Sequence, residues 1–336
     1  MQNTSTAVTK SVNKEKTHAI RNCIVCGKDE AKPLFSFTAD FLSNVRKQKL
    51  DEIKWQENTT STIVQCASCR CNYIRDVFIA DEDKFDTVIS AQAMENHVAR
   101  YSGIFTFDSV DHMNYSRAVI EVLLKHCAAQ GKKRISLLDF GSSLSMLSMF
   151  ARCGGFDTVV SYDPKFPLNI SDLLSTKHPL TVHFARSREE LLAFAPFDAI
   201  VCQSAIEHFY DPQAELRLMH ELLDEKGMLF INNPLMPLDK ELKFLKNESG
   251  IKDKRLLKIL RKSYHIDHLN YLTEKHFSAL IRKSGFREKK TFFFYRLFKP
   301  AAFLQGNVVR FIKACVIFML DLAGVKYKKV NFFLVK

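Results

Sequence analysis

The amino-acid sequence predicts an α/β protein in which a seven-stranded, mostly parallel sheet carries helices on both faces, preceded by a small cysteine-bearing module. The first observation is that, from residue 113 onward, apolar residues switch repeatedly between the periods of a helix and of a strand. Such alternation is typical of a parallel sheet covered on both sides. The second is a pair of short cysteine motifs near the N-terminus. With 336 residues, 46% of them hydrophobic, the chain is also long enough to form a sizeable core.

The N-terminal residues 1–20 contain no apolar stretch of the kind that a secretory signal needs. We therefore expect a disordered lead-in and a cytoplasmic protein. The later apolar segment 301–324 is interrupted by Arg310, Lys313 and Asp321, so it falls short of the roughly 20 apolar residues of a membrane span. The formal charge of +12 indicates attraction to anions, which include nucleic acid, an acidic membrane surface and a phosphorylated or carboxylated substrate.

Residues 21–80 form the cysteine module. Cys23 and Cys26 make one CxxC knuckle, and Cys66 and Cys69 make the second. Two such knuckles can present four thiolates to one zinc ion, and a site closed by four protein ligands is structural. The module therefore predicts a zinc-ribbon-like unit with short strands over 33–37 and 61–66, in which Cys71 is a spare thiol. The alternative is that the cysteines are free thiols at chance spacing.

The α/β body is predicted over 113–336, after a linker or helical connection over 81–112. Its helices end at glycines, and the helix at 212–227 has a proline at its start. The pattern predicts helices over 115–131, 145–155, 212–227 and 273–286, and strands over 134–140, 157–164, 180–184, 197–204, 228–234, 289–296 and 329–336. The last two strands are predicted to pair as a hairpin.

Ligands of such sheets bind beyond the carboxyl ends of the strands. The first strand ends at Asp139 and Gly141, the second at Asp163, and the fourth at residues 204–208. Asp163 follows Asp139 at a spacing near that at which an acidic residue receives a ribose diol. The alternative for Asp163 is a turn or helix cap before Pro164.

These blocks match a family. LLDFG, VVSYDP, FDAIVCQSAIEHFYDP, LLDEKGMLFINNP and HLNYLTEKHFSALIRKSGF together resemble class I S-adenosylmethionine (SAM)-dependent methyltransferases over residues 115–336. The third block is the most specific, because it is similar to the fourth-strand signature of that family. The cysteine module resembles the zinc-binding segment that precedes the methyltransferase domain in many bacterial sugar and natural-product methyltransferases. The resemblance implies a Rossmann-like fold with SAM as cofactor.

The resemblance also implies residue roles. It implies that Asp139 and Gly141 shape the loop beside the methionine part of the cofactor, and that Asp163 holds the ribose. It places Phe184 and Ala185 near adenine, and Ser204, Ala205 and Glu207 on the floor near the sulfonium. The departure is Ser143 and Ser145, which stand where the family favours glycine. A forced left-handed conformation at a residue other than glycine costs about 1–2 kcal/mol, which weakens cofactor binding without abolishing it.

The candidate catalytic bases are His208 and His268, because histidine accepts a proton near neutral pH. The alternative for His208 is a structural hydrogen bond beside the cofactor. A basic insertion at about 237–265 is predicted to form a lid, or else a solvated helix face. We expect methyl transfer to a small-molecule or glycan-precursor acceptor, with the charge favouring an anionic one. Contact with an anionic membrane surface is a further option, and the competing functions are a non-catalytic scaffold and an RNA methyltransferase.

Overall fold

The computed structural model of the chain describes residues 17–38, 60–79, 114–142, 146–164, 181–234, 268–293 and 329–336. The linker predicted over 81–112 and the basic lid predicted at 237–265 lie outside these residues, as does the hydrophobic segment 301–324. Within the described part of the chain, no helix combines the length and the apolar character needed to cross a bilayer.

The main sheet has seven strands, as predicted, in the order β12-β13-β10-β9-β6-β7-β8. Its central strands are parallel, and β13 runs antiparallel to both of its neighbours. The strands are β6 (Ser136–Phe140), β7 (Thr158–Tyr162), β8 (His183–Ala185), β9 (Phe197–Gln203), β10 (Leu223–Pro234), β12 (Arg287–Phe293) and β13 (Lys329–Val335). The Rossmann-like α/β class and the closing hairpin are therefore confirmed.

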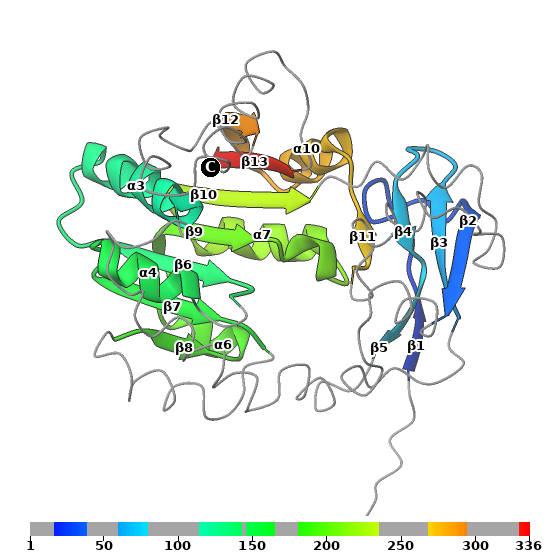
Figure 1. Cartoon of the computed structure of the whole chain (residues 1–336), viewed down its shortest axis with the longest axis horizontal. Helices are drawn as coiled ribbons and strands as arrows, with labels where there is room; N and C mark the ends of the chain where they lie inside the picture. Colours follow the sequence, from blue (N-terminus) through cyan, green and yellow to red (C-terminus); the bar gives the residue numbers. More distant parts are fainter. Residues whose placement is uncertain are drawn as a thin grey trace, which may run out of the picture.

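Helices cover both faces of this sheet (Figure 1). They are α3 (Asn114–Ala129), α4 (Met146–Gly154), the short α6 (Arg188–Leu192), α7 (Pro212–Leu222) and α10 (Glu274–Lys283). Successive strand residues point to opposite faces. Accordingly, Leu137 packs in the cluster formed with α3 and α4, whereas Leu138 packs in the cluster formed with α7 and α10. The apolar runs of the strands are thus explained by burial on both faces.

Two predicted boundaries differ from the structure. The helix predicted over 212–227 ends at Leu222, because Leu223 already pairs with Phe197 as the first residue of β10. The ladder shifts register between Leu223 and Met228, so the polar stretch between them forms an irregularity instead of a last helical turn. The third strand, predicted over 180–184, is the shorter β8, which ends one residue later.

The N-terminal module contains a second sheet of four strands in the order β11-β4-β3-β2. Its own strands are β2 (Ala31–Thr38), β3 (Thr60–Cys66) and β4 (Asn72–Ile74), and its edge strand β11 (Asn270–Tyr271) comes from the α/β body. A third, small sheet pairs β1 (Thr17–Ile20) with β5 (Asp76–Ile79), so four residues that were assigned to the lead-in form a strand.

The module stands at the carboxyl edge of the main sheet, since β6, β9 and β10 point towards it in Figure 1. Buried residues of the module, among them Cys23 and Tyr73, belong to the same hydrophobic cluster as Phe140 and Leu272 of the body. One continuous core therefore joins the two parts of the chain beside the edge where ligands bind in α/β sheets.

Candidate functional site

The loop after β6 and the loop after β9 approach each other at Gly141. Gly141 adopts φ +74°, and its backbone N–H donates to the carbonyl oxygen of Tyr162 over 2.9 Å. A Cβ atom built on Gly141 would lie 2.7 Å from the Cβ of Ala205, which is closer than real Cβ contacts come. Glycine is therefore required here both by the backbone conformation and by the close approach of two predicted cofactor residues.

Asp139 is the buried acid of the first strand end. Its carboxylate accepts a 2.7 Å hydrogen bond from the hydroxyl of Ser148 on α4, and Ser148 also contacts the hydroxyl of Ser161 over 2.8 Å. The pKa of Asp139 is raised to about 7, mainly by burial and to a smaller extent by the nearby charge of Asp163, against the lowering effect of the hydrogen bonds from Ser148. Asp139 and Asp163 thus form an acidic edge, in which burial favours the protonated form of Asp139.

The residues predicted to contact the ribose and the adenine lie at the ends of neighbouring strands of the sheet. Asp163 is half-buried directly after β7, and its N–H donates to the carbonyl of Ala185 at the end of β8 over 3.3 Å. Phe184 is half-buried and Ala185 is buried. Ser143 and Ser145, the predicted substitutions in the glycine loop, lie outside the described residues.

The end of β9 carries a second constrained turn. Ser204 has φ +52°, a left-handed conformation that is uncommon for a residue with a side chain. Its N–H and its hydroxyl both donate to the amide oxygen of Asn232, over 2.9 and 3.2 Å. Next to it, the side-chain oxygen of Gln203 is buried and has no hydrogen-bond partner among the described residues. Strain of this kind is often retained at functional sites.

Glu207, His208 and His268 form what we call the Glu–His cluster. The first two belong to the 3₁₀ helix η3 (Ile206–His208), and His268 lies two residues before β11. A carboxylate oxygen of Glu207 is 3.9 Å from Nε2 of His268, and the rings of His208 and His268 meet edge to face with centroids 4.8 Å apart. The two predicted bases are therefore neighbours, although 60 positions separate them in the sequence. Glu207, predicted as a cofactor residue, joins them.

Comparison with known families agrees with this geometry. The family model described as "Methyltransferase domain" matches residues 111–288, which is more than half of the chain. The chain belongs to this methyltransferase family. With the seven-stranded sheet, the family match makes the protein a class I SAM-dependent methyltransferase.

The chain is also similar, at TM-scores below 0.5, to solved structures that include three methyltransferases. A SAM-dependent methyltransferase from Clostridium acetobutylicum is 11% identical, with 71% of this chain and 97% of that chain covered and a TM-score of 0.44. The plantazolicin methyltransferase BpumL in complex with SAH is 12% identical, with 76% and 95% covered and a TM-score of 0.43. A SAM-dependent methyltransferase from Mesorhizobium loti is 15% identical, with 68% and 100% covered and a TM-score of 0.41. Scores in this range say nothing about the acceptor. No curated protein matches the sequence.

The methyltransferase holds its Glu–His cluster in place through Asn270 and Arg21, neither of which the sequence singled out. The amide of Asn270 donates to the carbonyls of Ile206 and Phe209, over 2.9 and 2.8 Å, and so clamps both ends of η3. Arg21 is buried and donates to the amide oxygen of Asn270 over 3.0 Å.

The same guanidinium also binds three backbone carbonyls. They are those of Ile74 in β4, Tyr210 after η3, and Leu269 beside His268. Burial lowers the pKa of Arg21 to about 10, which still leaves it charged at neutral pH. The sequence signal for this role was weak, since a single arginine or asparagine between apolar blocks is common. Asn232 and Asn233, near the end of β10, were a stronger sign of a functional position, because these polar residues interrupt a run of apolar ones.

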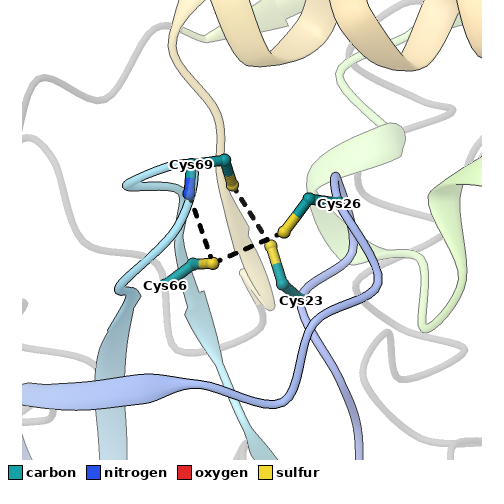
Figure 2. A group of neighbouring side chains, drawn as sticks. All are labelled: Cys23, Cys26, Cys66 and Cys69. Carbon is teal, nitrogen blue, oxygen red and sulfur yellow. Dashed lines mark hydrogen bonds between the residues drawn. The ribbon is translucent and has the colours of Figure 1, made fainter.

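The four predicted zinc ligands of the methyltransferase gather at one point between the two knuckles (Figure 2). The sulfur atoms of Cys23, Cys26, Cys66 and Cys69 lie within 4.8 Å of one another. Two of the sulfur pairs, Cys23 with Cys69 and Cys26 with Cys66, are 3.4 and 3.5 Å apart. Cys71 is buried but does not belong to this group of four.

Helix α10 of the body holds both knuckles. His276 contacts the carbonyl of Cys69 through Nε2 over 2.9 Å, and the ammonium group of Lys283 donates to the carbonyl of Val25. The knuckles are thus fixed to the helix that follows β11, so the cysteine cluster and the Glu–His cluster share one supporting segment.

Proposed function

We propose that this methyltransferase binds SAM along the carboxyl edge of β6, β7 and β9 and methylates a small-molecule or glycan-precursor acceptor. The observation that carries the proposal is the close contact of Gly141 with Ala205, which brings the ends of β6 and β9 together at the edge of the sheet where α/β folds bind their ligands. In the proposal, SAM supplies an activated methyl group on its sulfonium.

The residues of this edge suit that cofactor. Asp163 can provide negative potential for a cationic ligand, and it stands directly after β7, where a ribose diol would be received. The buried side-chain oxygen of Gln203 is an acceptor available to an amine or hydroxyl of the ligand. Phe184 and Ala185 form the apolar surface proposed for adenine. Ser204 and Ala205 form the proposed floor at the sulfonium, next to Glu207.

The acceptor side is proposed to be the region of His208 and His268, between η3 and the N-terminal module. Both histidines reach the same edge as the proposed cofactor floor, because η3 follows directly on Ser204 and Ala205. Aligning the acceptor with the methyl carbon provides much of the rate, and a histidine can accept the proton of the acceptor. The net charge of +12 supports an anionic acceptor such as a phosphorylated or nucleotide-linked sugar.

The cysteine module is proposed to hold a structural zinc ion. Sulfur atoms bound to one tetrahedral zinc at about 2.3 Å lie about 3.8 Å apart, and the measured 3.4 and 3.5 Å separations are close to this spacing. Four thiolates leave no coordination position for a substrate, so this ion would support the fold of the module and take no part in methyl transfer.

Calorimetric titration with S-adenosylhomocysteine tests the proposal. We expect the wild type to bind and Gly141→Ala to bind at least about tenfold more weakly, since the added methyl both strains φ and forces Ala205 away. Gly131→Ala is the matched control, because Gly131 also has positive φ (+71°) but nothing lies within 4 Å of its added Cβ.

Equal affinities of the two variants and the wild type would contradict the proposed site, and absence of binding to the wild type would contradict the cofactor. An RNA acceptor is the competing function. It predicts salt-dependent affinity for RNA, and lack of RNA binding at low salt would remove it.

A further inference from the structure

The Glu–His cluster has the composition of a metal site. It contains one carboxylate and two imidazoles, with one potential ligand atom from each of Glu207, His208 and His268, all within 4.8 Å of one another. An ion with bonds of about 2.1 Å can join two donor atoms separated by up to about 4.2 Å. The 3.9 Å between Glu207 and His268 lies within that reach, and a small rotation of the side chains would bring in the third ligand.

The backbone around the cluster is fixed before any ion arrives. The N–H of Leu269 donates to the carbonyl of Glu207 over 2.8 Å, which ties the segment of His268 to the centre of η3. The N–H of His208 donates to the carbonyl of Ala205 over 2.9 Å, and the amide of Asn270 bridges both ends of η3. Ligands that come from two distant segments bind an ion well only when such contacts position them in advance.

Burial adds an electrostatic reason for a cation. The side chains of Glu207 and His268 are 3% and 5% exposed. A carboxylate removed from water is costly unless positive charge or good hydrogen bonds compensate it. At 3.9 Å, the contact between Glu207 and His268 is too long for a hydrogen bond, and an ion placed between these donors would bring positive charge next to the buried carboxylate.

We propose that the Glu–His cluster binds one divalent transition-metal ion. Two imidazoles and one carboxylate favour ions such as Mn²⁺, Fe²⁺, Co²⁺ or Zn²⁺ over Mg²⁺ or Ca²⁺, which prefer all-oxygen sites. Three protein ligands leave coordination positions open, in contrast to the four-thiolate site of the module.

The inference rests on the proposed function and extends it to the class of acceptor. With coordination positions left open, the ion would take an acceptor hydroxyl as a further ligand and lower its pKa. The hydroxyl gives its proton to water, its oxygen forms a bond to the methyl carbon, and the carbon–sulfur bond breaks with its electron pair going to sulfur. The products are a methyl ether, S-adenosylhomocysteine and a proton. With the ion bound, the two histidines act as ligands instead of proton acceptors.

Mn²⁺ binding to the zinc-loaded chain tests the inference. It is measured from the loss of the electron paramagnetic resonance signal of free Mn²⁺, with Co²⁺ absorption as the second probe. We expect one Mn²⁺ ion per chain in the wild type, and in His268→Gln we expect Mn²⁺ affinity to be at least about tenfold lower. The matched control is His126→Gln, a histidine of α3 whose Nε2 contacts the carbonyl of Lys226, away from the site. The control variant is expected to bind Mn²⁺ as the wild type does.

S-adenosylhomocysteine affinity is measured on the same samples, so that a folded variant is distinguished from an unfolded one. Loss of Mn²⁺ with unchanged S-adenosylhomocysteine affinity in His268→Gln supports the metal site. If the wild type binds S-adenosylhomocysteine but neither Mn²⁺ nor Co²⁺, or if His268→Gln binds Mn²⁺ as well as the wild type does, the metal site is overturned while the methyltransferase function stands. Absence of S-adenosylhomocysteine binding in a wild type that binds Mn²⁺ contradicts the proposed function and not the ion.

Discussion

The cysteine cluster and the Glu–His cluster both contact the segment from His268 to α10, yet they are built differently. Each cysteine knuckle is a turn of four residues, and its two thiols are close whatever the rest of the chain does. The Glu–His cluster exists only because β11 pairs with β4 while Asn270 clamps η3. The first cluster is closed and chemically uniform, whereas the second is mixed and open. A closed local site suits a structural ion, and an open one assembled by the fold suits chemistry.

Breaking the cysteine cluster is expected to have the largest effect. Binding of a structural zinc contributes directly to folding free energy, so Cys66→Ser should lose the ion and lower the free energy of unfolding by about 4 kcal/mol or more. Because both knuckles are held by α10, the Glu–His cluster should also lose its Mn²⁺ affinity. Metal analysis, thermal melting and the Mn²⁺ signal measure these outcomes.

Cys71→Ala is the control for this variant, since Cys71 is buried beside the group of four without belonging to it. It should retain one zinc per chain and lose only the packing of a small side chain and the contacts of its thiol with Cys23 and with the carbonyl of Asn72. Zinc that remains bound at full stoichiometry in Cys66→Ser would show that the cluster is not the site.

Arg21→Lys tests whether the guanidinium of Arg21 supports the Glu–His cluster. Lysine cannot reproduce the guanidinium fork, so the carbonyls of Ile74, Tyr210 and Leu269 would lose a shared donor. We expect a loss of about 3 kcal/mol in the free energy of unfolding, with weaker Mn²⁺ binding and unchanged zinc content.

Arg75→Lys is the matched variant for this test. Arg75 lies in the same module but makes a surface ion pair with Asp29, whose side chain is 63% exposed. The change should cost well under about 1 kcal/mol. If Arg21→Lys proves as mild as Arg75→Lys, the guanidinium of Arg21 does not hold the Glu–His cluster in place.

The contrast also explains what the sequence could predict. The spacing of apolar residues predicts the main sheet, because both faces of its strands are buried and the pattern is local. The two cysteine knuckles could be predicted equally well. The pairing of β4 with β11 could not be predicted, because Asn270 and Tyr271 form a strand of two residues, which is too short to show a strand period.

The candidate site divides in the same way. Gly141, Asp163 and His208 follow strand ends, so the predicted topology alone was enough to place them near a ligand site. Arg21 acts from a position 249 residues away from its partner Asn270, and only the folded chain shows that contact. Ser143 and Ser145 remain predictions, because they lie outside the described residues.

The smallest effect concerns the α/β side alone. Burial raises the pKa of Asp139 from 3.8 to about 7, so between these values the folded chain holds a proton that the unfolded chain has released. The contribution of Asp139 to stability is therefore fully present below pH 4 and falls as the pH rises towards 7. Asp139→Asn removes this slope, and the stability of the variant relative to the wild type should rise by about 2 kcal/mol between about pH 5 and pH 6.5.

Urea denaturation of both proteins across that range measures the difference. Arg21→Lys should keep the wild-type slope, because its contacts lie around the module and not around Ser148 and Asp139. Parallel curves for the wild type and Asp139→Asn would mean that the carboxylate stays ionised in the folded chain. In that case the hydrogen bond from Ser148 outweighs the cost of burial, and the acidic edge already carries the charge that a cationic cofactor would meet.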